Sequence, residues 1–235
     1  MLRGPGVTVV IPAYNEERGI TAGVQAVLQA LGPAGWEHEV IVVDDGSTDA
    51  TARLAEECGV QVMRLETNRG YGAALKAGIA RAKHDWVAII DADGTYPASE
   101  LPRMLEYLPA HDMVVGARTG RDVHHPLSRR PAKWLLRKLA SKLAGSEIPD
   151  LNSGLRVIRK SRVDEFAELL PSGFSFTTTI TLAMISRGYP VLYLPINYHK
   201  RVGESKIRPS HALRFAVLIV KTTRRLRRLK KMSAG

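Results

Sequence analysis

One short apolar run that ends in two acids, residues 86–93, most constrains how this chain folds. Five apolar residues, 86–90, are followed by Asp91, Ala92 and Asp93. A run of this length that stops at charged residues is typical of a buried parallel strand rather than a helix. Because ligands of open α/β sheets bind beyond the carboxyl ends of the strands, we expect a charged site at this point.

Similar short apolar runs alternate with helical patterns along the chain. Strands are predicted at residues 7–11, 39–43, 60–65, 86–90, 157–158 and 191–194. Helices are predicted to end near residues 31, 58, 82, 144 and 187, and a last helix to follow residue 209. Asn15 is expected to cap the first helix, and Ser47 or Thr48 the second. Strands that alternate with helices of roughly 10–15 residues predict right-handed βαβ units and an α/β fold with a mainly parallel sheet.

Composition bounds the class of protein. The chain has 235 residues, of which 45% are hydrophobic, and this is enough for one sizeable core. The one cysteine, Cys58, excludes an internal disulfide and favours a reducing compartment. No signal-peptide pattern is recognised, so a cytoplasmic location is expected. A net charge of +11 predicts a polyanionic partner, which is a nucleic acid, an anionic membrane surface or a phosphorylated substrate.

Asp91 and Asp93 are candidate metal ligands. In an extended chain they lie on one side with Ala92 on the other, and two neighbouring carboxylates repel unless a cation separates them. Mg²⁺ or Mn²⁺ held between this pair and a diphosphate fits the preference of hard cations for oxygen ligands. The alternative is a solvated turn in which Gly94 has a positive φ.

Asp45 follows the second predicted strand, so we expect it at the same edge of the sheet. There it can accept hydrogen bonds from a base or a ribose, with Tyr14 stacking on the base. The patterns GxxxxGK(S/T) and GxGxxG are absent, which argues against a P-loop NTPase and a Rossmann dehydrogenase. A diphosphate would therefore be neutralised by a metal, by arginines such as Arg118 and Arg201, or by both.

Six motifs occur in a fixed order along the chain: PxYNE, VVDDGSTD, NRGYGAAL, DADGTYP, VGAR and RVGESK. Over residues 7–208 this ordered set resembles the inverting family 2 glycosyltransferases of the GT-A fold. It is most similar to their polyprenyl-phosphate branch, which includes dolichol-phosphate mannose synthase and bacterial undecaprenyl-phosphate glucosyltransferases. The resemblance implies a GDP- or UDP-linked sugar as donor, a polyprenyl phosphate as acceptor, and Mg²⁺ or Mn²⁺ as cofactor.

The resemblance also implies roles for individual residues. Contacts with the donor nucleotide are expected from Pro12, Tyr14, Glu16, Asp45, Asp91 and Ala92. Asp91 and Asp93 would hold the metal, and catalysis is expected to depend on Asp93, Arg118 and Arg201. Contacts with the acceptor phosphate are expected from Ser153, Arg156 and Lys206. Thr95 departs from the pattern of the mannose synthases, which usually carry a Gln there as a further metal ligand.

Two basic helices predict contact with a membrane surface. A helix from Pro131 to Ala144 has an apolar stripe with Trp134 at its margin and basic residues on its other side, although an ordinary surface helix packed on the core shows the same pattern. The uncharged run 215–220 is too short to span a bilayer, and the basic cluster after it suits an anionic leaflet. We expect a glycosyltransferase domain at 1–208, with a nucleotide-binding half at 1–118 and an acceptor half at 119–208, and a membrane-associating tail at 209–235. No nucleic-acid-binding motif is recognised.

The expected function is the metal-dependent, inverting transfer of a sugar from a nucleotide-diphosphate sugar to a polyprenyl phosphate. It would take place peripherally, on the cytoplasmic face of the membrane, with or without a separate membrane subunit. Two alternatives remain open. A soluble hydroxyl acceptor would need a carboxylate base, for which Asp150 is the candidate, whereas a non-catalytic nucleotide-sugar or membrane adaptor would release no sugar.

Overall fold

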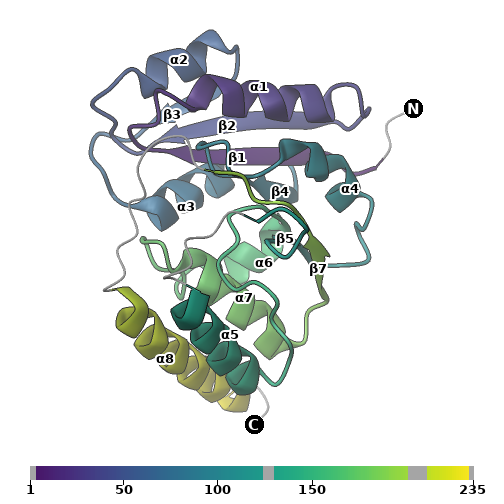
Figure 1. Cartoon of the computed structure of the whole chain (residues 1–235), viewed down its shortest axis with the longest axis vertical. Helices are drawn as coiled ribbons and strands as arrows, with labels where there is room; N and C mark the ends of the chain where they lie inside the picture. The colour runs from purple at the N-terminus through teal and green to yellow at the C-terminus, as the bar shows by residue number, and fades with distance from the viewer. Residues whose placement is uncertain (1–3, 124–129, 201–210, 233–235) are drawn as a thin grey trace.

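A seven-stranded sheet forms the centre of the molecule (Figure 1). The computed structural model describes residues 4–123, 130–200 and 211–232. In chain order the strands are β1 (Val7–Ala13), β2 (His38–Asp44), β3 (Gln61–Arg64), β4 (Trp86–Ile89), β5 (Met113–Ala117), β6 (Arg156–Arg159) and β7 (Val191–Pro195). Their order across the sheet is β3-β2-β1-β4-β6-β5-β7. Among the described strands only β6 runs antiparallel to its neighbours, β4 and β5, so the predicted mainly parallel sheet is confirmed.

Helices cover both faces of this sheet. They are α1 (Ile20–Leu31), α2 (Thr51–Glu57), α3 (Tyr71–Arg81), a 3₁₀ turn η1 (Ala98–Glu100), α4 (Leu101–Leu105), α5 (Arg130–Ala144), α6 (Lys160–Glu165), α7 (Phe176–Arg187) and α8 (His211–Met232). On β1, Val9 and Ile11 join the core beneath α1 and α4, whereas Val10 joins the core beneath α3 and α7. Because both faces of the strand are buried, its sequence is a continuous apolar run rather than an alternating one.

The predicted helix caps are wrong. Asn15 has a positive φ of 50°, its side-chain oxygen accepts a hydrogen bond from the backbone N–H of Thr48, and α1 begins only at Ile20. The Ser47 hydroxyl in turn accepts a hydrogen bond from the backbone N–H of Asn15. The side chains of Asn15 and Ser47 therefore bind the backbone of the opposite turn across neighbouring strand ends instead of capping the helices that follow them. The positive φ expected for Gly94 is observed, at 69°.

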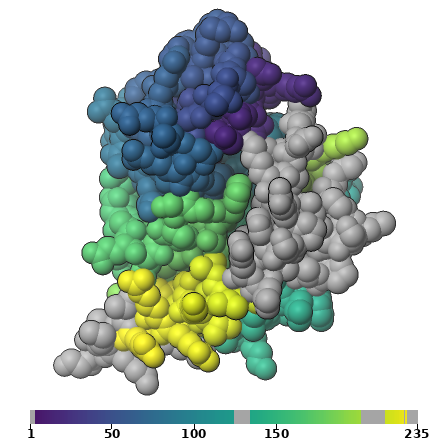
Figure 2. All heavy atoms as spheres, turned by 90° about the vertical axis from the view of Figure 1, so that its left-hand side faces the viewer, coloured from purple at the N-terminus to yellow at the C-terminus, as the bar shows by residue number. Residues whose placement is uncertain are grey.

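The helices α5 and α8 lie side by side at the end of the molecule far from α1 and α2 (Figure 1). In Figure 2 the described part of α8 (yellow) forms part of the surface at the bottom of the view, directly below the green segment that includes α7. On α8, Ile219, Thr223 and Leu226 recur at helical spacing and are buried. On α5, most of the predicted apolar stripe packs on the protein core, and among its described apolar residues only Trp134 and Leu135 are exposed, by 56% and 63%. None of the described helices combines the length and the apolar character that a bilayer span requires.

Candidate active site

The turns after β1 and β2 are joined at the carboxyl edge of the sheet. The backbone N–H of Glu16 donates to the Thr51 hydroxyl at 2.8 Å, and the N–H of Asn15 donates to the Ser47 hydroxyl at 2.9 Å. Pro12 is buried within β1, where it pairs with Val43, so it supports this turn from inside the sheet. Tyr14 and Glu16 are partly exposed at the edge, where the sequence predicted a nucleotide.

Asp45 holds the turn that precedes α3. Its two carboxylate oxygens accept hydrogen bonds from the backbone N–H groups of Arg69 and Gly70, each at 2.8 Å, and the residue is only 3% exposed. Asp45, which was predicted to contact the nucleoside, therefore stabilises the turn formed by Asn68, Arg69 and Gly70.

Tyr71, the residue after Gly70, connects this turn to the Asp91 carboxylate. Its phenolic O–H donates to Asp91 Oδ1 at 2.8 Å, and its ring stacks on Phe174 with the centroids 5.6 Å apart. Burial, reinforced by the neighbouring Asp91 charge, raises the pKa of Tyr71 well above its ordinary value, so the phenol keeps its proton and remains a donor. Asp45 and Asp91 are thus linked through the consecutive residues Gly70 and Tyr71. The sequence motif NRGYGAAL contains this tyrosine, but its role was not predicted, because it depends on the contact with Asp91 in the folded chain.

Asp93 is held by the residue that departs from the mannose-synthase pattern. The backbone N–H and the hydroxyl of Thr95 both donate to Asp93 Oδ1, at 3.0 and 2.6 Å. Asp93 is 5% exposed and Thr95 is fully buried. Thr95 therefore orients the Asp93 carboxylate.

The backbone at Gly154 lies directly against the Asp91 carboxylate. A β-carbon built at Gly154 would lie 2.4 Å from Asp91 Oδ2, closer than any real side chain approaches. The Gly154 N–H donates to the hydroxyl of the buried Tyr96 at 2.6 Å, which fixes the peptide in this place. Only glycine permits so close an approach between this backbone and a carboxylate.

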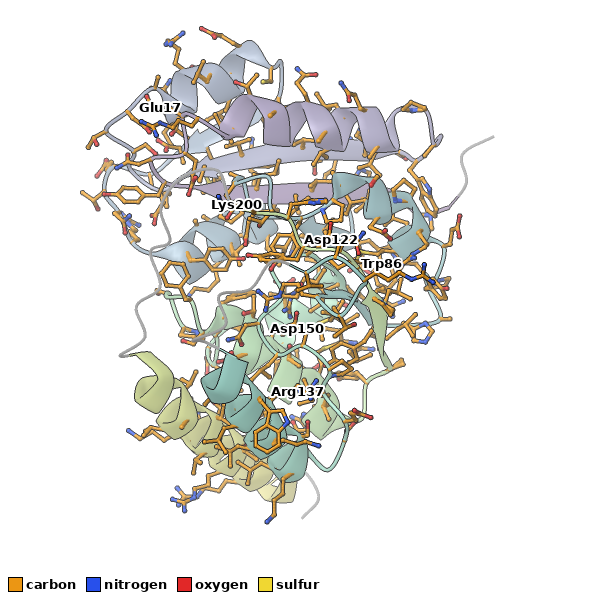
Figure 3. All side chains as sticks on the ribbon, viewed as in Figure 1. Glu17, Trp86, Asp122, Arg137, Asp150 and Lys200 are labelled. Atoms are coloured by element: carbon orange, nitrogen blue, oxygen red, sulfur yellow. The ribbon has the colours of Figure 1, made fainter. Side chains whose placement is uncertain are left out.

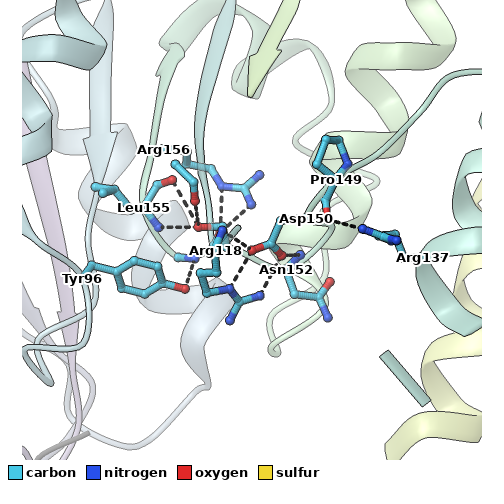
Figure 4. A network of polar contacts seen from close by, with 11 residues as sticks. Tyr96, Arg118, Arg137, Pro149, Asp150, Asn152, Leu155 and Arg156 are labelled. Carbon is cyan, nitrogen blue, oxygen red and sulfur yellow. Dashed lines mark hydrogen bonds and ion pairs between the residues drawn. The ribbon is translucent and has the colours of Figure 1, made fainter. Parts of the chain in front are cut away.

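Arg118 and Asp150 form a bidentate ion pair beside these residues (Figure 4). The guanidinium donates to both carboxylate oxygens, at 2.6 and 2.7 Å, and also lies 5.2 Å from the centroid of the Tyr198 ring. Burial disfavours the charged form of Asp150, but the adjacent Arg118 outweighs it and lowers the pKa of Asp150 to about 2. A carboxylate with so low a pKa is a poor general base at neutral pH, which weakens the hydroxyl-acceptor alternative. Arg137 of α5 donates to the carbonyl of Pro149, next to Asp150 (Figure 4).

Three predicted contact residues lie in the interior. Ser153 and Arg156 are fully buried, and the Ser153 hydroxyl donates to the carbonyl of Gly116 at 2.6 Å. Direct contact of these two side chains with an acceptor phosphate does not fit their burial, because both point into the protein. Ala92 is 2% exposed, and its carbonyl packs against the first turns of α1.

The remaining predicted residues belong to the segment that follows β7. Its start is fixed at the site, because the Tyr198 N–H donates to the Asp122 carbonyl and the His199 N–H donates to the Thr95 carbonyl, both at 2.9 Å. Asp122 and Lys200, which belong to the two segments joined here, are labelled in Figure 3. Arg201 and Lys206 lie outside the described residues, so their predicted roles stay predictions.

Comparison with known proteins identifies the family. The model of the family described as Glycosyl transferase family 2 matches residues 8–166. The chain belongs to this family. Relatives of this family 2 chain include a dolichyl-phosphate hexose transferase of Haloferax volcanii (32% identity over 86% of this chain and 87% of the relative) and an undecaprenyl-phosphate mannosyltransferase of Micrococcus luteus (31%, 86% and 87%). It is also similar to the low-salt glycan biosynthesis hexosyltransferase Agl6 of Haloferax volcanii, at 31% identity, but spans only 50% of that protein.

Solved structures confirm the GT-A fold. Glucosyl-3-phosphoglycerate synthase from Mycobacterium tuberculosis, solved with Mn²⁺, UDP and phosphoglyceric acid, superposes with a TM-score of 0.72 at 22% identity, over 93% of this chain and 77% of its own. The same enzyme solved with Mg²⁺ and UDP gives a TM-score of 0.69. The predicted family, its enzyme class and its fold are therefore confirmed.

The acidic residues after β4 suit a divalent cation in this glycosyltransferase. Within the described residues, no three His, Cys, Asp or Glu side chains cluster as a closed metal site. Two carboxylates, from Asp91 and Asp93, are nevertheless the number of protein ligands typical of Mg²⁺ sites completed by water and substrate phosphates. Each carboxylate is oriented by a hydroxyl donor, from Tyr71 or Thr95, as is usual for groups that bind metals. The donor set therefore fits Mg²⁺ or Mn²⁺.

Proposed function

We propose that this family 2 glycosyltransferase transfers a sugar from a nucleotide-diphosphate sugar to a polyprenyl phosphate with inversion at the anomeric carbon. The observation that carries the proposal is the connected set of carboxylates at the sheet edge, in which Gly70 and Tyr71 join Asp45 to Asp91. The relatives named for dolichyl and undecaprenyl phosphate support the lipid acceptor. The UDP complexes of the structural neighbours support a UDP-linked donor, with a GDP-linked one as the alternative to be tested.

On the donor side, the described residues would bind and orient the leaving group. The nucleoside would lie along the turns of Tyr14 and Asp45, and the diphosphate would reach the acidic pair Asp91 and Asp93. A divalent cation bound there stabilises the negative charge that develops on the leaving diphosphate. Tyr71 and Thr95 keep the two carboxylates in one orientation, so little reorganisation is needed as the charge develops.

On the acceptor side, the electrostatics favour a nucleophile that arrives already ionised. A phosphate monoester has a second pKa of about 6, so at neutral pH its oxygen attacks without a protein base. Asp150, the candidate base for a hydroxyl acceptor, is committed to Arg118 and has a pKa of about 2. We propose that this ion pair fixes the plane of the Arg118 guanidinium, which would then contact phosphate, together with Arg201 and Lys206 after β7.

A second part of the proposal is peripheral attachment to the cytoplasmic face of the membrane. Neither α5 nor α8 contains an acidic residue. Trp134 and Leu135 of α5 and Val217 of α8 are exposed, as are the basic side chains of Arg224 and Arg225. Each basic residue near an anionic leaflet contributes about 1 kcal/mol to binding, and exposed apolar side chains can enter the interface.

Transfer assays with purified protein test the proposed reaction. UDP- and GDP-linked sugars would be incubated with Mn²⁺ and either undecaprenyl phosphate or undecaprenol, the matched acceptor that lacks only the phosphate. We expect a lipid-linked sugar with the phosphate acceptor alone, and its loss in Asp93→Ala at saturating metal. Equal transfer to undecaprenol would refute the acceptor assignment, and full activity of Asp93→Ala would refute the metal assignment. Absence of any sugar release would favour the adaptor, unless added membrane extract restored transfer and indicated a separate membrane subunit.

A further inference from the structure

Arg156 is a charged side chain in the interior whose role the proposed reaction does not use. It begins β6, is fully buried and is among the largest completely buried side chains described. Its guanidinium donates twice to the carbonyl of Ser153, at 2.5 and 3.2 Å, and once to the hydroxyl of Thr181 on α7, at 3.1 Å. Arg156 therefore ties the turn before β6 to α7.

No described carboxylate forms an ion pair with this guanidinium, whose charge is met by carbonyl and hydroxyl oxygens instead. Burying a charge without a counter-ion destabilises the folded state, even when hydrogen bonds satisfy it. An apolar side chain of similar volume would fill the same space without this cost. The arginine must therefore provide something that packing does not, and its two bonds to one carbonyl identify the Ser153 peptide as the group that it holds.

The Ser153–Gly154 peptide is the backbone that touches Asp91. Gly154 approaches the Asp91 carboxylate so closely that a β-carbon would lie 2.4 Å from Oδ2. Arg156 holds this peptide at its carbonyl, and Tyr96 accepts a hydrogen bond from the next N–H. The Asp91 carboxylate is thereby enclosed between Gly154 on one side and the Tyr71 hydroxyl on another.

We propose that Arg156 is a positioning residue for Asp91: by holding the Ser153 carbonyl it presses the Gly154 backbone against the carboxylate and fixes its orientation. The inference rests on the metal-binding part of the proposed function and deepens it. It replaces the expected contact of Arg156 with the acceptor phosphate by an indirect role on the donor side. Loss of residues that orient metal ligands typically weakens metal binding by about 10–100-fold, and we expect an effect in this range.

Mn²⁺ titration followed by electron paramagnetic resonance, with and without UDP, tests the inference without relying on catalysis. Arg156→Met removes the bonds to Ser153 and the buried charge together, so the protein is expected to stay folded while Mn²⁺ affinity falls at least about tenfold. Arg156→Lys keeps one donor for the carbonyl and is expected to lose less. The matched control is Arg159→Met, at the other end of the same strand, where the guanidinium lies over Trp86 and the variant should leave Mn²⁺ affinity unchanged.

The outcomes separate the inference from the proposed function. Unchanged Mn²⁺ affinity in folded Arg156→Met would overturn the positioning role, whereas a wild-type protein that binds no Mn²⁺ would overturn the metal site itself. If Arg156→Met does not fold, Arg156→Lys takes its place, and an Mn²⁺ affinity equal to that of the wild type would again overturn the positioning role. Combining Arg156→Lys with Gly154→Ala gives an independent readout: because both changes displace one carboxylate, their joint loss should be smaller than the product of the single losses. A multiplicative joint loss would count against the inference.

Discussion

Replacing Gly154 by alanine should disable the site while leaving the fold intact. The new β-carbon would lie 2.4 Å from Asp91 Oδ2 and 2.7 Å from Oδ1. Non-bonded heavy atoms normally approach to about 3.5 Å, so the carboxylate must move by roughly 1 Å. A displacement of about 1 Å in a group that orients a reacting centre can cost about 100-fold in rate. We therefore expect Gly154→Ala to lose about two orders of magnitude in kcat.

The assay compares the initial rate of sugar transfer and the Mn²⁺ affinity of Gly154→Ala with those of the wild type. Gly173→Ala is the matched control, because a β-carbon at Gly173 meets no atom within 4 Å. This control should retain full activity, and both variants should unfold cooperatively in urea. If Gly154→Ala kept wild-type activity and Mn²⁺ affinity, the close contact between the Gly154 backbone and Asp91 would have no functional meaning, and our account of the site would be wrong.

Three further predictions follow from the same contacts. Tyr71→Phe keeps the aromatic ring but removes the hydrogen bond to Asp91, so Mn²⁺ affinity and transfer rate should fall about tenfold, and unchanged values would contradict the link. The pKa of Asp150 is lowered from 3.8 to about 2 in the folded state, so its ionised form stabilises the fold above pH 4, and this stabilisation is lost as the pH falls towards 2. In urea titrations, the free energy of unfolding should therefore fall on acidification by about 2 kcal/mol more for the wild type than for Asp150→Asn. Reversing the charges of Arg224 and Arg225 to Glu should abolish sedimentation with anionic vesicles but not with neutral ones, and unchanged sedimentation would exclude this membrane-facing surface.

The fold was largely predictable because its strands are buried on both faces. Continuous apolar runs such as residues 7–11 and 86–90 are typical of strands whose two faces are both covered by helices. The motif VGAR does not by itself predict the strand β5, at Met113–Ala117, and the apolar residues 157–158 do not predict the direction of β6. Antiparallel insertion of β6 depends on contacts far apart along the chain, which a local pattern does not contain.

The acidic residues of the site were predictable, but their support was not. Asp91 and Asp93 can be recognised in the sequence because they are charged residues at the end of an apolar run. The roles of Tyr71 and Thr95 depend on contacts that exist only in the folded chain. The predicted contact between Arg156 and the acceptor phosphate assumed that the guanidinium is accessible to a ligand. Its complete burial, and its two bonds to the Ser153 carbonyl, are properties of the packed core between β6 and α7.

The location of bound Mn²⁺ tests the central claim most directly. Anomalous diffraction from a crystal grown with Mn²⁺ and UDP or GDP would locate the ion without reference to activity. Our account predicts a single strong peak for an ion that is coordinated by the carboxylates of Asp91 and Asp93 and by the diphosphate of the bound nucleotide. Mn²⁺ bound elsewhere, with these two carboxylates facing only protein and solvent, would contradict it.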